Sequence, residues 1–131
     1  MTIKSASNLP LVGIYGLGIM GGTMAEEMLR QGYPVCGYDL DAKARARLKK
    51  VGGQVMADNT AVAAHAEVVI VSVASAKALA DVSQAIAAAP RKRGRKPQVV
   101  VETSTLTLDD KNQSEQVLRR AGRVVLDCPI S

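Results

Sequence analysis

Short apolar runs alternate along this chain with longer segments that mix apolar and polar positions. The apolar runs, rich in valine and isoleucine, cover residues 11–15, 34–38, 54–56, 67–72, 98–102 and 123–126. Runs of this length that end in glycine, proline or polar residues are typical of buried strands. The mixed segments have a helical pattern and cover residues 19–31, 39–50, 61–66, 76–89 and 107–121. This alternation predicts a single α/β domain: a doubly wound parallel sheet of about six strands, in the order 3-2-1-4-5-6, with helices on both faces.

Two local features of the helices can also be predicted. The helix over residues 19–31 has an apolar face formed by Met20, Met24, Met28 and Leu29. Asn59 or Thr60 is a suitable N-cap for the short helix over residues 61–66.

The composition is that of an ordinary globular domain: of 131 residues, 47% are hydrophobic and 22% are charged. There are three Tyr and no Phe or Trp, which argues against a stacking surface for single-stranded nucleic acid. Cys36 and Cys128 lie in apolar sequence, and we expect both to be reduced and buried. The chain has neither a membrane-spanning run nor the apolar stretch of a signal peptide, so we expect a cytoplasmic protein.

The positive charge is concentrated in one segment. The net charge is +5, and residues 91–96 alone carry five cationic side chains. Such a charge run is usually a solvated loop, and that is our interpretation; contact with nucleic acid or phosphate is the alternative. The single histidine, His65, has no acidic or nucleophilic residue placed with it, so we expect it to face solvent. We predict no metal site.

A glycine-rich motif connects the first predicted strand to the first predicted helix. Residues 16–21 read Gly16-Leu17-Gly18-Ile19-Met20-Gly21, a G-x-G-x-x-G in the strand-to-helix context that makes it informative. Gly16 permits a tight turn, Gly18 lets a pyrophosphate approach the backbone, and Gly21 lets the helix lie close to the strand. The free N–H groups around Ile19 and Met20 can bind phosphate oxygens. We therefore expect a dinucleotide-binding site.

An acidic residue at the end of the second strand indicates which dinucleotide is bound. Asp39 lies about 20 residues after Gly18, where a carboxylate accepts hydrogen bonds from the adenosine ribose. The same carboxylate repels the 2′-phosphate of NADP, and no cation lies between Asp39 and Lys43. We therefore expect NAD in preference to NADP. A helix cap is the alternative role for Asp39.

Three further loops follow predicted parallel strands and converge on the edge of the sheet that holds the motif. They contain Val73-Ala74-Ser75, Ser104-Thr105 and residues 127–131.

The order and spacing of these motifs resemble those of the β-hydroxyacid dehydrogenases. This family includes 3-hydroxyisobutyrate dehydrogenase, tartronate-semialdehyde reductase and the 6-phosphogluconate dehydrogenases. Its G-L-G-x-M-G-x-x-M-A run is similar to residues 16–25, its D-x-S-T to residues 102–105, and its D-A-P-V-S to residues 127–131. Small departures are Leu108 in place of a proline and Val73-Ala74 in place of Leu-Pro.

The resemblance implies roles for individual residues. Gly16, Leu17, Gly18, Ile19, Met20 and Gly21 would bind the pyrophosphate, and Asp39 the adenosine ribose. Val73 and Ala74 would line the adenosine side, and Thr105 would lie near the nicotinamide. Ser131 would bind the carboxylate of a substrate, which the family implies is a small 3-hydroxy acid or the matching semialdehyde.

The family's catalytic lysine, on a long helix after the cofactor domain, matches no lysine of residues 1–131. We therefore expect a cofactor-binding half that lacks the all-helical C-terminal domain, which completes the site and builds the family's oligomer. Such a chain would bind NAD with little or no turnover. Two alternatives stay open: a non-catalytic nucleotide-binding or nucleic-acid-associated scaffold, and the cofactor domain of an imine reductase, which replaces the lysine.

Overall fold

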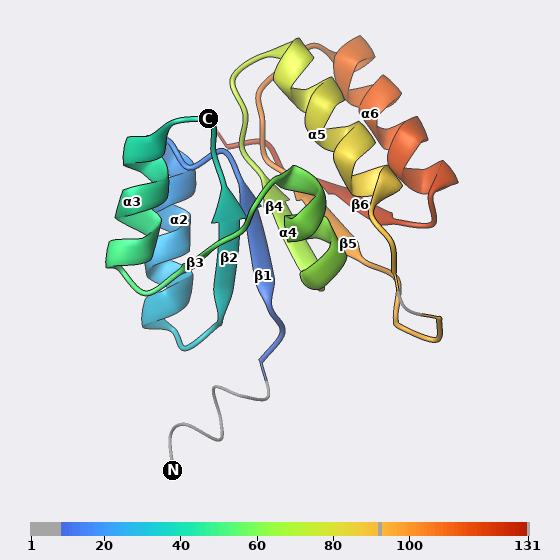
Figure 1. Cartoon of the computed structure of the whole chain (residues 1–131). Helices are drawn as coiled ribbons and strands as arrows, with labels where there is room; N and C mark the ends of the chain where they lie inside the picture. The colour runs from blue at the N-terminus through green and yellow to red at the C-terminus, as the bar shows by residue number, and fades with distance from the viewer. Residues whose placement is uncertain (1–8, 92, 131) are drawn as a thin grey trace.

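Six parallel strands form the centre of the computed structural model, which describes residues 9–91 and 93–130. Their order, β3-β2-β1-β4-β5-β6, is the predicted one. The strands are β1 (Val12–Tyr15), β2 (Val35–Tyr38), β3 (Gln54–Val55), β4 (Val68–Val71), β5 (Val99–Glu102) and β6 (Val124–Asp127). Every neighbouring pair is parallel, so the carboxyl ends of all the strands lie at the upper edge of the sheet in Figure 1.

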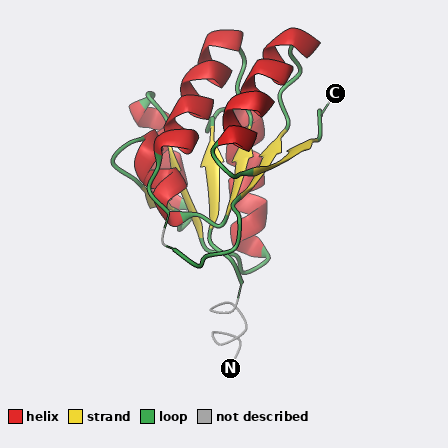
Figure 2. Ribbon diagram, turned by 90° about the vertical axis from the view of Figure 1, so that its right-hand side faces the viewer, coloured by secondary structure: helices red, strands yellow, loops and turns green. Residues whose placement is uncertain are grey.

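Helices cover both faces of this sheet, which confirms the predicted doubly wound α/β fold. In the described part of the chain they are α2 (Ile19–Arg30), α3 (Ala42–Lys50), α4 (Asn59–His65), α5 (Ala76–Ala88) and α6 (Leu108–Arg120). α2 and α3 lie on one face beside β1, β2 and β3, and α4, α5 and α6 lie on the other (Figure 1). Figure 2 shows the yellow strands between the helices. None of the described helices has the length and apolarity needed to cross a membrane.

The core consists of two apolar clusters, one on each face of the sheet. Side chains alternate between the faces along a strand, so β1 contributes to both clusters. Val12 and Ile14 pack with Ala25 of α2 and with Ala44 and Leu48 of α3. On the other face, Tyr15 belongs to a cluster with buried residues of the remaining helices, among them Val62, Leu79, Ile86 and Leu118. β1 is therefore held rigidly from both sides, and it ends at the glycine motif.

Two local predictions about the helices need correction. The N-cap of α4 is Asp58, not Asn59 or Thr60, because the Asp58 carboxylate accepts a hydrogen bond of 2.8 Å from the N–H of Ala61. The helix starts earlier than predicted, so its cap moves with it. The predicted apolar face of α2 is correct for Met24, Met28 and Leu29, which pack against the core, whereas Met20 in the first turn is 46% exposed.

The prediction for the cysteines is correct for one residue and wrong for the other. Both are free thiols; Cys36 in β2 is buried, but Cys128 is exposed. Cys128 follows β6, the edge strand, and one face of β6 is uncovered by any described helix. Val124 and Leu126 on that face are 41% and 47% exposed. Apolar sequence on such an edge does not produce burial.

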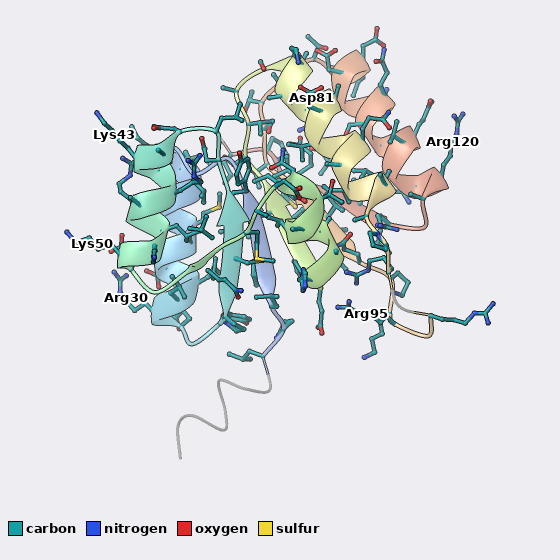
Figure 3. The ribbon with its side chains drawn as sticks, in the orientation of Figure 1. Arg30, Lys43, Lys50, Asp81, Arg95 and Arg120 are labelled. Carbon is teal, nitrogen blue, oxygen red and sulfur yellow. The ribbon has the colours of Figure 1, made fainter. Side chains whose placement is uncertain are left out.

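The basic segment is only partly a solvated loop. Arg91 Nη1 donates hydrogen bonds to the carbonyls of Ala63 and Ala66, at 3.1 and 2.7 Å, at the C-terminal end of α4. Arg95 reaches the carbonyl of His65 at 3.5 Å, while the His65 side chain is exposed, as predicted. Figure 3 shows Arg95 at the end of the sheet opposite Lys43 and Asp81. The segment therefore lies away from the carboxyl ends of the strands.

Candidate functional site

The three glycines of the motif have different structural roles. Gly16 has a φ of +87°, and a Cβ there would lie 1.9 Å from the carbonyl oxygen of Ser72. A Cβ on Gly21 would lie 1.6 Å from the carbonyl oxygen of Gly16. A Cβ on Gly18 would meet nothing within 4 Å. The fold requires glycine at 16 and 21, whereas the lack of a side chain at 18 leaves space that a ligand can approach.

The N-terminus of α2 lies directly behind this open position. Gly18 is its N-cap, with no side-chain capping hydrogen bond and no acidic residue in the first turn. By contrast, each of the other four described helices has a side-chain cap. The side chains of Ile19 and Met20 point outward, 92% and 46% exposed. The first backbone N–H groups of α2 are therefore suited to donate hydrogen bonds to an anion.

Asp39 lies beside the motif, as its position after β2 predicts. Its Oδ2 accepts a hydrogen bond of 2.9 Å from the N–H of Leu17, and its Oδ1 accepts one of 2.8 Å from the N–H of Asp41. The carboxylate thus links the glycine loop to the loop after β2. The alternative role of helix cap is excluded, because Asp41 caps α3.

Arg45 is a neighbour of Asp39 that the sequence analysis did not identify. Its Nη1 donates hydrogen bonds to the carbonyls of Asp39 and Leu40, at 2.7 and 3.0 Å. Its guanidinium lies over the ring of Tyr38, 5.6 Å from the ring centre. Arg45 follows Lys43 in the sequence, but one turn of α3 brings its side chain back to the loop after β2. The helical register of residues 42–50 is the signal that could have revealed it.

A cavity of about 190 Å³ joins the glycine loop to the loops after β2 and β4. Among the predicted site residues, Gly16, Asp39 and Val73 line it, and Ala74 does not. Asn59 and Asp81, which no motif singled out, also line it. Its floor includes Tyr15, whose hydroxyl donates a 2.6 Å hydrogen bond to the carbonyl of Asn59. Burial raises the pKa of Tyr15, so its hydroxyl stays protonated.

A larger cavity, of about 580 Å³, lies between α2 and α3. Leu17, Gly18 and Ile19 form one end of it, and residues of the two helices, together with Val51 after α3, form its remaining walls. The motif therefore lies between the two cavities.

The loops after β4, β5 and β6 are joined by hydrogen bonds. The N–H of Val73 donates to Ser104 Oγ at 2.9 Å, and Thr105 Oγ1 donates to the carbonyl of Ile130 at 3.1 Å. The predicted convergence of these loops is confirmed. Ser131 lies outside the described residues. Lys111, which matched no motif, lies among these loops, with its Nζ 2.7 Å from the carbonyl oxygen of Ser104.

Comparisons with known proteins agree with this geometry. Residues 11–131 match the family described as the NAD binding domain of 6-phosphogluconate dehydrogenase. The mitochondrial 3-hydroxyisobutyrate dehydrogenase of Mus musculus is 29% identical over 126 residues, which are 96% of this chain and 37% of the mouse protein. The structure of Mycobacterium tuberculosis 3-hydroxyisobutyrate dehydrogenase with L-serine has a TM-score of 0.86 at 24% identity, over 94% of this chain and 41% of that one.

More distant structures share the fold. Imine reductase from Myxococcus stipitatus has TM-scores of 0.76 for a variant in complex with NAD+ and 0.75 in complex with NADP+, each at 15% identity over 88% of this chain and 39% of that one. The chain spans less than half the length of these relatives. Its own match to the family covers nearly all of its residues. The chain belongs to the family of the NAD binding domain of 6-phosphogluconate dehydrogenase, whose fold and glycine motif it carries.

Proposed function

We propose that this chain binds NAD across the carboxyl edge of its sheet, as the cofactor half of an oxidoreductase. The parent enzyme would transfer a hydride between NAD(P) and a small 3-hydroxy acid or the matching semialdehyde. The observation that carries the proposal is the open space at Gly18 in front of the uncapped N-terminus of α2, with Asp39 beside it. A bound nicotinamide ring would supply or accept the hydride.

Different residues of the chain would bind different parts of the dinucleotide. Residues 16–21 would hold the pyrophosphate through backbone N–H groups, and Gly18 would leave room for it. Asp39 would accept hydrogen bonds from the ribose, with Val73 and Ala74 on the adenosine side. Thr105 would lie near the nicotinamide and Ser131 near the substrate carboxylate. We assign no proton transfer to these residues, so the chain would hold the cofactor without supplying a catalytic acid or base.

The preference for NAD over NADP is a proposal that rests on Asp39. Its carboxylate lies within hydrogen-bond distance of the glycine loop, where it would repel a 2′-phosphate. The positive charge of Arg45 would attract a 2′-phosphate, but its guanidinium already donates hydrogen bonds to two backbone carbonyls. The fold itself accommodates both cofactors in the imine reductase structures.

The test is a titration with NADH and NADPH, followed by enzyme assays. Bound NADH can be followed by the fluorescence of its own nicotinamide ring, since the chain has no Trp whose quenching could report binding instead. We expect saturable binding of NADH, weaker binding of NADPH, and no reduction of succinic semialdehyde or oxidation of 3-hydroxyisobutyrate and glycerate. Clear turnover would contradict the claim that the chain lacks the catalytic group. An NADPH affinity equal to that of NADH would contradict the role of Asp39.

The cofactor domain of an imine reductase is the second candidate, favoured by the shared fold. Reduction of a cyclic imine by the full-length parent, with no activity on hydroxy acids, would establish it.

We also propose that the parent is a homo-oligomer in the cytoplasm. The mouse relative is described as mitochondrial, so cell fractionation is the test of location. A nucleic-acid role has less support, because Arg91 and Arg95 contact backbone carbonyls.

A further inference from the structure

A lysine on α6 reaches back to the edge of the sheet where the loops meet. The side chain of Lys111 is only 12% exposed. Its Nζ lies 2.5 Å from Oδ1 of Asp127, 2.7 Å from the carbonyl oxygen of Ser104 and 3.1 Å from Oε1 of Glu102. One ammonium group thus contacts three oxygens from two different strand ends.

These three oxygens belong to the segments that carry the proposed nicotinamide side of the site. Glu102 is the last residue of β5 and Asp127 is the last residue of β6. Ser104 lies in the loop between β5 and α6, and its N–H donates a 3.1 Å hydrogen bond to Oε2 of Glu102. Thr105 comes next and donates to the carbonyl of Ile130 in the loop after β6. Lys111 therefore joins the two segments that hold Thr105 in place.

The charges explain why a lysine is held at this position. Glu102 is 3% exposed, and a carboxylate so deeply buried needs a nearby cation. Burial alone would lower the pKa of Lys111, but its interactions with Asp127 and Glu102 outweigh that effect and raise the pKa. The lysine stays protonated, so it is suited to hold the loops and unsuited to act as a base.

We propose that Lys111 is a positioning residue that fixes the loops after β5 and β6, and with them Thr105, for the nicotinamide half of the cofactor. The proposal rests on the proposed function, since it concerns how NAD is held. The pyrophosphate and adenosine side is built separately, by the glycine loop and Asp39. Lys111 therefore affects the two halves of the cofactor differently.

The experiment compares NADH with ADP, which lacks the nicotinamide half. Calorimetric titrations of Lys111→Met should give about tenfold weaker binding of NADH and an ADP affinity within about twofold of the original. Arg119→Met is the matched control: it removes a cation of the same helix whose partner, Glu115, is on the surface, and it should change neither affinity. If Lys111→Met weakens both ligands equally, or weakens neither, the proposal is overturned.

A second measurement needs no cofactor. Amide hydrogen exchange of residues 103–105, Cys128 and Ile130 should become faster in Lys111→Met and stay the same in Arg119→Met. Unchanged exchange in Lys111→Met would overturn the positioning role even if the chain binds NADH. If the original chain binds neither NADH nor ADP, the proposed function fails, while the exchange result still decides whether Lys111 holds the loops.

The unpaired Glu102 carboxylate could prevent Lys111→Met from folding. The double variant Lys111→Met with Glu102→Gln removes both charges and avoids that problem. It should also bind NADH weakly and ADP normally, because the contacts of Lys111 with Ser104 and Asp127 are lost as well. Normal NADH binding by the double variant would overturn the proposal.

Discussion

Gly18 and Gly21 belong to one motif, but their surroundings differ, so substitution should affect the free energy of unfolding differently at the two positions. A Cβ at position 21 collides with the carbonyl of Gly16, while one at position 18 meets open space, and the φ of −69° at Gly18 suits alanine. We predict that Gly21→Ala lowers the free energy of unfolding by about 3 kcal/mol and that Gly18→Ala changes it by less than about 0.5 kcal/mol. Urea unfolding followed by circular dichroism measures both. Equal destabilisation would show that Gly18 also has a structural role.

We propose that Asp39 determines the preference for NAD over NADP. Its replacement by serine removes the negative charge that opposes a 2′-phosphate. We predict that Asp39→Ser lowers the dissociation constant of NADPH relative to that of NADH by about tenfold. Asp109→Ser is the control, because Asp109 is an exposed acidic residue in the first turn of α6, away from the glycine loop. A ratio unchanged by Asp39→Ser would remove the basis for the NAD preference.

The two thiols should react at very different rates. Cys128 is exposed, whereas Cys36 is buried and burial raises its pKa to about 11. The reactive thiolate is therefore scarce at Cys36 near neutral pH, and reagent has no access to it. We predict that the folded chain releases one equivalent of thionitrobenzoate quickly from Ellman's reagent, and the second only on unfolding. Cys128→Ser should abolish the fast phase; a fast phase that persists would place the reactive thiol at Cys36.

At the scale of the elements, the fold could be predicted from the alternation of apolar runs and helical segments. The central strands β1 and β4 are covered on both faces, and a continuous apolar run such as residues 67–72 indicates such a strand clearly. Element ends were less predictable. The cap of α4 was misplaced because Asp58 and Asn59 are both good capping residues, and only the backbone decides which one precedes the first turn.

The basic segment shows a second limit of the sequence pattern. A run of cations predicts a solvated loop, but Arg91 is held by carbonyls at the end of α4, which are close only in the folded chain. We predict that Arg91→Met lowers the free energy of unfolding by about 1 kcal/mol, because two carbonyls lose a charged donor. The exposed Arg93 provides the control, and Arg93→Met should change the free energy by less than about 0.5 kcal/mol. Thermal unfolding of the two variants measures the difference, and equal midpoints would mean that Arg91 is not a structural residue.

At the scale of the whole molecule, some parts of the site could be predicted from the sequence and others could not. The glycine motif is contiguous, and Asp39 lies at a fixed distance from it, so both could be predicted. Lys111 and Arg45 could not, since each meets its partners only after a helix has folded back onto a loop. Cys128 was placed wrongly for a related reason: whether a strand lies at the edge of the sheet depends on the order of all the strands.

We propose that the carboxyl edge of this sheet binds NADH at the space left by Gly18. The most direct test is the NADH titration of the original chain and of Gly18→Ala, with the fold of each confirmed by circular dichroism. We expect saturable NADH binding at one site per chain, displaced by ADP, and an affinity reduced roughly tenfold or more in Gly18→Ala. A folded original chain that shows no saturable binding, or a Gly18→Ala variant that binds NADH as tightly as the original, would contradict it.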